Sequence, residues 1–533
     1  MRVIGAKTVD GSVTATASGT IVNNKPVILN ANGTVSAISG TINTTQVINT
    51  LTDPFGSNPS GDIKSVCFSP DTNQIVVATA VSSASNEGRV LVGTVDPSNN
   101  TVTWGSNHTV FSSTANSKTK IHCMYNEVLD HVEILWRESS TTRLVKGTLS
   151  GTGTAASVTN VTSPYMLEGN SPSHITASID QSTGVGLLMF QDGGSTNSNV
   201  KAWRWNGSAF VQSASTEVPH APSTGGSGAE ARNPDSVYCA NTAGSNPLIA
   251  FVYNDDDNGQ DGTILAYSTA WNGSAASFTV GTSRVFEAAG TDWQNIAYSP
   301  SKNRILVVGA SSGINSGQGG LKVYEFTPPT SGANALNGNY FSQYGSRNIL
   351  HGVYSSTFPT IVYDEESNKN IIIYCDTSDG GKTKTLIGTR EFYSASAQYA
   401  YANRYDLSVV TGNQGQAFCF VYDSNAERSV LLYSDTTSAR MKGYIIRPEF
   451  AETTNATTKG CIGFADGGYS NGQTVTVKVA NSIIGGQSLT PGKFYYVRED
   501  GTLSTVSGNP AIEAGIAVST TELLITSNEE RIN

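Results

Sequence analysis

Residues 418–423 read FCFVYD and residues 430–433 read VLLY, with the polar stretch SNAERS between them. Aromatic and β-branched residues dominate both runs, and two such runs around a polar turn indicate a pair of β-strands joined as a hairpin. No segment of the chain shows the sustained 3.6-residue apolar period that an amphipathic helix requires. The hairpin is therefore the unit from which we predict an all-β fold.

The same pattern of apolar strand, polar turn, second apolar strand and later third strand occurs seven times. The residues that open the seven turns are Ser69, Asn126, Asp180, Thr242, Ser299, Asp364 and Asp423. The 354 residues from the first to the last divide into six intervals with a mean of 59, and a third strand begins 17 to 22 residues after each turn. Repeats of several strands fit the blades of a β-propeller, which hides its sheet edges by closing a ring. We predict a seven-bladed β-propeller over residues 53–448, with a stacked solenoid as the alternative.

The two ends of the chain contain similar segments. Residues 25–36 (KPVILNANGTVS) line up with residues 493–504 (KFYYVREDGTLS). In both, an apolar strand meets an Asn-Gly or Asp-Gly pair and returns through Thr, an aliphatic residue and Ser, which indicates a tight hairpin. The N-terminal segment holds too few strands to bury a core alone. We therefore predict a small β-sandwich or barrel-like module built from residues 1–52 and 449–533, with the propeller inserted between them.

Composition limits the partners. The chain has 533 residues, 14% of them charged, and a formal net charge of −10. It has no run of Lys or Arg, so we expect no nucleic-acid partner. No apolar run reaches the roughly 18 residues that span a bilayer, and the N-terminus lacks the apolar core of a signal peptide, so we expect cytoplasmic synthesis and no membrane insertion.

The six cysteines show no paired spacing and are predicted to be buried free thiols.

Four segments near the C-terminus carry a family resemblance. They are residues 461–466 (CIGFAD), 471–477 (NGQTVTV), 486–497 (GQSLTPGKFYYV) and 515–521 (GIAVSTT). In this order they resemble the C-terminal β-module of tailed-bacteriophage fibre proteins. Near the N-terminus, ASGTI (17–21) followed by PVILN (26–30) is similar to the segment that precedes the repeats in such proteins.

The resemblance implies a virion structural protein, most directly a tail fibre or receptor-binding protein that attaches to a host-surface glycan or protein. It also implies contacts with other virion proteins and assembly into a homo-oligomer, often a trimer, located in the virion tail. A capsid decoration or head-fibre protein, or a tail nozzle component, is the first alternative. A propeller glycosidase that acts on host polysaccharide is the second.

One acidic cluster has the spacing of a metal site. Asp255, Asp257 and Asp261 stand at alternating positions around Gly259. Calcium takes hard oxygen ligands of this kind, and glycine permits the sharp turn between them, although the complete twelve-residue loop with its final Glu is missing. The cluster predicts a calcium site, with a solvated hairpin tip as the alternative. No other cofactor is expected.

Two copies of the sequence WNGSA begin at Trp205 and Trp271, close to one repeat apart, and Trp203 shares a strand face with Trp205. Exposed indole rings beside Asn and Ser would form a platform for stacking against sugar rings. The three tryptophans are therefore candidate glycan-binding residues, with packing between outer strands as the alternative.

Catalytic motifs are sparse. The histidines are scattered, and no nucleophile elbow or paired metal ligands occur. Asp364, Glu365 and Glu366 are adjacent carboxylates, whereas glycoside hydrolysis needs two carboxyl groups held some 5–9 Å apart. Neighbours at the end of a strand more often form a solvated turn, so we name no catalytic residue and predict a protein that is not an enzyme.

Overall fold

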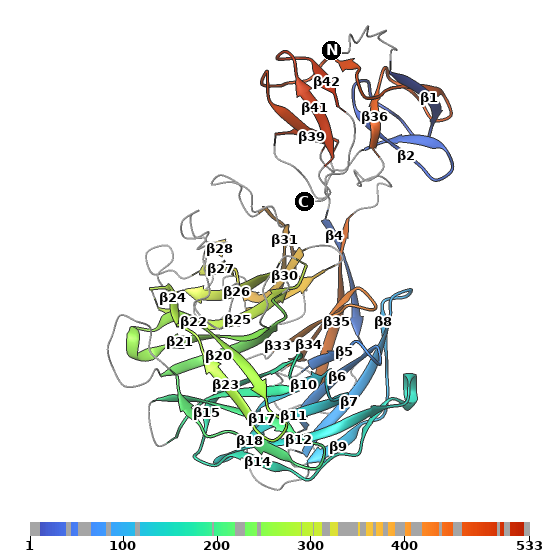
Figure 1. The fold of residues 1–533 in the computed structure, drawn as a ribbon. Helices are drawn as coiled ribbons and strands as arrows, with labels where there is room; N and C mark the ends of the chain where they lie inside the picture. Colours follow the sequence, from blue (N-terminus) through green and yellow to red (C-terminus); the bar gives the residue numbers. More distant parts are fainter. Residues whose placement is uncertain are drawn as a thin grey trace. The chain divides into compact units, whose positions relative to one another are not determined.

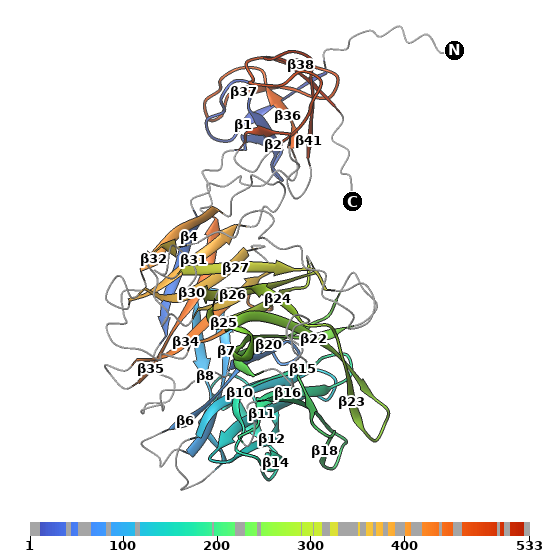
Figure 2. The same cartoon turned by 90° about the vertical axis from the view of Figure 1, so that its left-hand side faces the viewer.

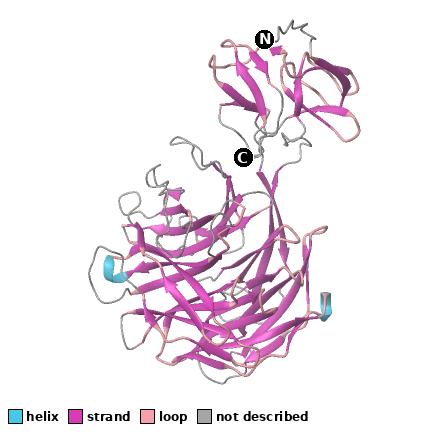
Figure 3. Cartoon of the chain, in the orientation of Figure 1, coloured by secondary structure: helices cyan, strands magenta, loops and turns pink. Residues whose placement is uncertain are grey.

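A computed structural model describes the fold. The described residues are 11–38, 44–51, 66–81, 87–111, 118–193, 197–218, 230–241, 247–288, 290–301, 303–311, 320–328, 350–351, 359–365, 369–376, 382–389, 400–406, 418–435, 440–450, 461–497, 501–505 and 512–526. Their regular structure consists of strands and two short 3-10 turns, η2 (Gly153–Ala155) and η3 (Asp256–Asn258), as Figure 3 shows. The chain divides into one unit made of residues 1–45 and 449–533 and a second unit of residues 46–448. Within the described residues, no helix has the length and apolar character needed to cross a membrane.

The described part of the second unit contains seven antiparallel sheets, one for each sequence repeat (Figure 1). The first three sheets contain β5 (Val66–Ser69), β6 (Gln74–Val81), β7 (Glu87–Asp96), β8 (Thr101–Trp104) and β9 (His108–Phe111); β10 (Lys118–Asn126), β11 (His131–Glu138), β12 (Thr141–Ser150), β13 (Ser157–Thr159) and β14 (Tyr165–Glu168); and β15 (Ser173–Asp180), β16 (Val185–Gln191), β17 (Ser198–Trp205), β18 (Phe210–Gln212) and β19 (Thr216–Glu217).

The other four sheets follow the same plan. They contain β20 (Ala231–Cys239), β21 (Leu248–Asp255), β22 (Asp261–Trp271), β23 (Ala276–Val280) and β24 (Arg284–Glu287); β25 (Thr291–Ser299), β26 (Arg304–Ser311), β27 (Gly320–Phe326) and β28 (Leu350–His351); β29 (Thr360–Asp364), β30 (Lys369–Asp376), β31 (Lys382–Thr389) and β32 (Ala400–Asp406); and β33 (Phe418–Asp423), β34 (Arg428–Asp435), β35 (Arg440–Phe450) and β4 (Thr44–Leu51).

The first strands of the seven sheets form a closed ring. Each of β5, β10, β15, β20, β25, β29 and β33 contacts the next in this order, and β33 contacts β5. Figure 2 shows β10, β15, β20 and β25 from a second direction. The sheets stand around this ring, so that the middle strands are covered on both faces by neighbouring sheets. All residues of β6 and of β21 are buried. This explains why the second strand of each repeat is a continuous apolar run and not an alternating one. The predicted all-β propeller is confirmed.

The seventh sheet is completed by a strand from the N-terminal part of the chain. β4 forms the outer edge of the seventh sheet, beside β35. Leu51, at its end, is 5% exposed and packs with Val430, Leu432 and Met441. The predicted boundary after residue 52 is therefore wrong, because residues 46–51 belong to the propeller unit. An added edge strand satisfies backbone groups that β35 would otherwise leave unpaired.

The other unit combines strands from both chain ends. Its N-terminal strands are β1 (Ser12–Ala17), β2 (Pro26–Leu29) and β3 (Thr34–Ala37), and its C-terminal strands are β36 (Cys461–Ala465), β37 (Thr474–Lys478), β38 (Ile483–Ile484), β39 (Phe494–Val497), β40 (Leu503–Ser504), β41 (Glu513–Ala517) and β42 (Leu523–Ile525). A closed barrel has the order β1-β3-β2-β36-β37, and a second sheet has the order β38-β42-β41-β39-β40. The predicted barrel-like module, which we call the end module, is confirmed.

The barrel and the second sheet repeat one topology. The order β3-β2-β36-β37-β1 matches β40-β39-β41-β42-β38 strand for strand. Gly463 pairs with Val27 in the barrel, Gly515 pairs with Tyr495 in the sheet, and the register shifts directly after each pair. Both glycines have a φ of 152°, which side chains rarely adopt. The similarity between the two predicted hairpins is thus part of a larger internal duplication.

Candidate functional site

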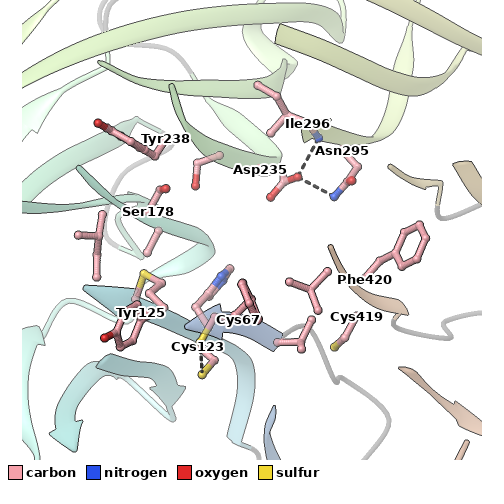
Figure 4. Close-up of a pocket in the computed structure, with 18 of the residues that line it drawn as sticks. Cys67, Cys123, Tyr125, Ser178, Asp235, Tyr238, Asn295, Ile296, Cys419 and Phe420 are labelled. Atoms are coloured by element: carbon pink, nitrogen blue, oxygen red, sulfur yellow. Dashed lines mark hydrogen bonds between the residues drawn. The ribbon is translucent and has the colours of Figure 1, made fainter. Parts of the chain in front are cut away.

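A cavity of about 410 Å³ lies within the ring of first strands. All seven first strands contribute lining residues, and Figure 4 shows those of several sheets facing a common space. Its size falls in the range of small-molecule sites. We call this space the axial cavity and treat it as the candidate binding site of the propeller.

A relay of hydrogen bonds fixes one side of the axial cavity. Asn295 Nδ2 donates to Asp235 Oδ2 at 2.6 Å, and the backbone N–H of Ile296 donates to the same oxygen at 3.0 Å (Figure 4). Asn295 Oδ1 in turn accepts from the backbone N–H of Ile361 at 2.8 Å and from the hydroxyl of Thr360 at 3.2 Å. These bonds connect β20 to β25 and β25 to β29, and they fix the orientation of the Asn295 amide.

A tyrosine on the cavity wall lies beside two carboxylates. The hydroxyl of Tyr125 lies 2.8 Å from Asp71 Oδ2 and 2.7 Å from Asp130 Oδ1. Burial and these carboxylates raise the pKa of Tyr125 well above its ordinary value. Burial and the charge of Asp71 likewise raise the pKa of Glu127 in the same turn region. Asp71, Glu127 and Asp130 are not lining residues themselves, so this cluster acts on the cavity through the Tyr125 side chain.

Thiols occupy another part of the wall. The Sγ atoms of Cys67 on β5 and Cys123 on β10 are 3.3 Å apart. A dashed line marks this contact in Figure 4. Cys123 is 7% exposed and Cys67 is half-buried. The four described cysteines other than Cys67 are buried, and none of the five described is in a disulfide, whereas the side chain of Cys375 lies outside the described residues.

The lining chemistry suits a small polar ligand. Ser178, Ser236, Tyr238 and Gln181 add hydroxyl and amide groups to those of the relay. Among the described lining residues, Asp235 is the one carboxylate, and its Oδ2 already accepts two hydrogen bonds. Hydrogen-bond recognition is thus the chemistry that the wall offers directly.

The structure corrects the prediction for Trp203. This side chain is fully buried on β17, and its Nε1 donates to Glu133 Oε2 at 2.6 Å. Glu133 itself is fully buried and also accepts from Asn126 Nδ2 at 3.1 Å and contacts His131 Nε2 at 2.9 Å. Trp203 therefore packs between the second and third sheets and cannot stack on a sugar. That Trp203 and Trp205 share a strand face does not establish that the Trp203 side chain is exposed.

Trp205 and Trp271 lie at neighbouring hairpins of the third and fourth sheets, because β17 contacts β23. Both are half-buried. Lys146 Nζ lies 4.9 Å from the ring centroid of Trp205, and the Arg204 guanidinium lies 4.5 Å from that of Trp271. A cation therefore covers part of each ring, at distances typical of cation–π contacts. The two rings remain candidates without Trp203.

The two WNGSA copies form hairpin tips. Asn206 Oδ1 accepts from the backbone N–H groups of Ser208 and Ala209, and Asn272 Oδ1 makes the matching bonds in the other copy. Such local bonds are typical of Asx turns.

The predicted calcium site gains no support from the geometry. Asp255 and Asp261 oppose each other in the β21–β22 pair, whereas Asp257 is exposed in the connecting turn. Arg232 Nη2 lies 2.9 Å from Asp256 Oδ2 and supplies positive charge beside the cluster. Across the described ranges, no three His, Cys, Asp or Glu side chains come together in a way that could hold a metal ion. Asp257 lies at an exposed hairpin tip, as the alternative describes, whereas Asp255 is 0% exposed.

The adjacent acidic residues of the sixth repeat differ in their exposure. Asp364 is buried at the end of β29, Glu365 is exposed, and Glu366 lies outside the described residues. Partial desolvation of its carboxyl group and the charge of Asp364 raise the pKa of Glu365. Sequence reasoning missed Glu133, Asp235 and Asn295. Glu133 precedes the apolar run Ile134–Trp136 on β11, whereas β20 and β25 are rich in polar residues, so nothing in the sequence distinguishes Asp235 or Asn295 from their neighbours.

Comparisons with known proteins concern the fold. No family model and no curated protein matches the chain. Among solved structures, the periplasmic gluconolactonase PpgL of Pseudomonas aeruginosa is similar at 11% identity and a TM-score of 0.41, covering 74% of this chain and 95% of that one. The Cps50 (Swd1) β-propeller domain of Myceliophteria thermophila is similar at 9% identity and a TM-score of 0.39, covering 76% of this chain and 100% of that one.

A variant of the NanB sialidase of Streptococcus pneumoniae is also similar, at 10% identity and a TM-score of 0.35, covering 76% of this chain and 70% of that one. Two of these three structures are named for an activity, a gluconolactonase and a sialidase, and the third is named for its β-propeller domain. None of the three is named as a bacteriophage protein. The fold class alone does not assign a function.

Proposed function

We propose that this protein is a non-enzymatic virion structural protein of a tailed bacteriophage, and that it acts as a tail fibre or receptor-binding protein. The observation that carries the proposal is the end module. The segments that resemble phage fibre proteins all lie within this one module, in which β1 pairs with β37 and β2 pairs with β36. The chain ends therefore build a separate anchor, and the propeller is an insertion available for contact with a host.

A row of apolar side chains on the end module supports self-association. Ile483, Leu524, Ile516 and Phe494 oppose one another across β38, β42, β41 and β39. Ile483 is 49% exposed and Phe494 is 48% exposed. Such an apolar row on an outer sheet face is typical of an interaction surface.

The internal duplication indicates what covers this row. Phe464 of the barrel occupies the position equivalent to Ile516 and is 1% exposed, because it packs against the inner face of the second sheet with Tyr495 and Leu523. The position of Phe464 is thus covered in the barrel, whereas the equivalent Ile516 belongs to a row whose ends, Ile483 and Phe494, are exposed. We assign this row to contact with other copies of this chain, in a homo-oligomer that we expect to be a trimer.

The propeller would then present several weak sites at once. Trp205, Trp271 and the axial cavity are the candidate contacts for a host glycan or protein. In an oligomer, each later binding event is intramolecular, so weak sites give avid attachment.

The assembly step is tested on the full chain by light scattering after size exclusion. We expect a mass about three times the 56.0 kDa of one chain, and a monomer for Phe494→Glu, because a buried charge in the contact lacks a partner. Val280→Glu, at a position 39% exposed on the propeller, is the matched control and should leave the oligomer intact. A monomeric wild-type chain would contradict the proposed contact.

The binding step is tested on a glycan array with the full chain. Trp205→Ala and Trp271→Ala should each weaken a bound signal about tenfold, whereas Trp203→Phe should leave it unchanged. If the chain also releases reducing sugar from host polysaccharide, the glycosidase alternative replaces the non-enzymatic role. The number of copies per virion distinguishes the capsid alternative from a tail fibre, because the copy number of a decoration protein follows the symmetry of the capsid.

A further inference from the structure

Cys67 and Cys123 belong to neighbouring sheets but share one contact. Cys67 lies on β5 and Cys123 on β10, and these first strands are consecutive in the ring. Their Sγ atoms are 3.3 Å apart (Figure 4). A disulfide has an S–S length of about 2.05 Å, so the two sulfurs need to approach by roughly 1.2 Å.

The pair is accessible to small reagents. Both cysteines line the axial cavity, and Cys67 is half-buried. By contrast, Cys239 is fully buried and is not a lining residue. A small oxidant that enters the cavity therefore reaches the Cys67–Cys123 pair, and the partner thiol is already in contact when the first one reacts.

We propose that Cys67 and Cys123 form an oxidisable dithiol that closes into a disulfide between the first and second sheets. With hydrogen peroxide as oxidant, one thiolate attacks a peroxide oxygen and becomes a sulfenic acid with loss of one water. The second sulfur then attacks the sulfenic sulfur, the S–S bond forms, and a second water leaves. Two thiols and one peroxide thus give one disulfide and two waters.

The environment sets the rate of this closure. Burial and the contact with Cys123 raise the pKa of the Cys67 thiol well above its ordinary value. Because the thiolate is the reactive form, closure is slow at neutral pH and accelerates as the pH rises. The dithiol therefore stays reduced in a reducing cytoplasm and closes after transfer to an oxidising medium. This inference does not depend on the proposed host-attachment role.

The test uses the folded full chain treated with hydrogen peroxide, then denatured, alkylated and analysed by peptide mass spectrometry. Of the six cysteines, four should be alkylated, and one cross-linked peptide should contain Cys67 and Cys123. The closed form should melt roughly 5 °C higher, because the disulfide restricts the unfolded chain over a long loop. Dithiothreitol should reverse both changes in the same sample, which requires no variant.

Two variants complete the design. In Cys123→Ser, Cys67 should give a dimedone-reactive sulfenic acid and no thermal shift. Cys239→Ser is the matched control and should retain the cross-link. Six alkylated thiols after oxidation, or separate sulfinic and sulfonic products at Cys67 and Cys123 without a cross-link, would overturn the proposal.

Discussion

The indole of Trp203 and the carboxylate of Glu133 form a 2.6 Å hydrogen bond that joins the third sheet of the propeller to the second. Both side chains are fully buried, and His131 and Asn126 contact the other oxygen of the carboxylate. A buried carboxylate requires such partners, because an unpaired charge in the interior is costly. The bond therefore makes Trp203 a structural residue.

Trp203→Phe should destabilise the propeller by about 2 kcal/mol, since it removes one donor to a buried charge and leaves part of the indole volume empty. Trp205→Phe, on the same strand but half-buried, should cost less than about 1 kcal/mol. Denaturant unfolding of the two variants measures the difference. Equal costs would contradict the assigned role of the Glu133 bond.

Gly186 provides a second test of the same region. A Cβ at this position would lie 2.1 Å from the Trp203 ring, so Gly186→Ala forces the indole out of place. We expect a loss of roughly 3 kcal/mol, typical of severe overpacking. Gly309, in the second strand of the fifth sheet, is the control, because its nearest atom to a Cβ is Gln294 Cγ at 3.5 Å. Gly309→Ala should leave the free energy of unfolding within about 0.5 kcal/mol of the wild-type value.

A buried ion pair predicts a pH dependence. Lys201 Nζ lies 2.6 Å from Glu168 Oε2. Burial raises the pKa of Glu168, but the hydrogen bonds from Lys201 and the Gly169 backbone outweigh it, so that the pKa lies below its ordinary value of 4.5. A lowered folded-state pKa means that the stabilisation is complete above pH 4.5 and is lost as the pH falls through the folded-state value.

Glu168→Gln should therefore lose stability at pH 6 and converge on wild type in acid, as urea unfolding between pH 6 and pH 3 would measure. Glu217→Gln, at an exposed position on the third sheet, is the matched control. A constant difference between wild type and Glu168→Gln across this range would show that the pair does not titrate as described.

Deleting residues 1–45 tests the shared construction of the end module. β1 and β2 supply partners for β37 and β36, so the remaining C-terminal strands should lose their cooperative unfolding. Calorimetry of the full and shortened chains shows whether the transition of the module disappears. A shortened chain that keeps this transition would contradict the pairing.

The sequence predicted what depends on local pattern. The seven strand–turn–strand repeats and the Asn32-Gly33 hairpin follow from strand composition and turn chemistry, and Gly33 has a φ of 81° as such a turn requires. The sequence could not assign residues 46–51 to the propeller, because this edge strand is recognised only by its pairing with β35. Nor could the sequence show that Trp203 meets Glu133 of another repeat. The two-residue period of a strand tells which side chains share a face, but it does not tell which face is exposed.

The most direct test of the central claim is immunogold electron microscopy of intact virions with antibody to the propeller. Attachment through a tail fibre or receptor-binding protein predicts label at the tail tip or fibres. Label over the head would contradict the attachment role and favour capsid decoration, and virions without any label would contradict a virion role altogether.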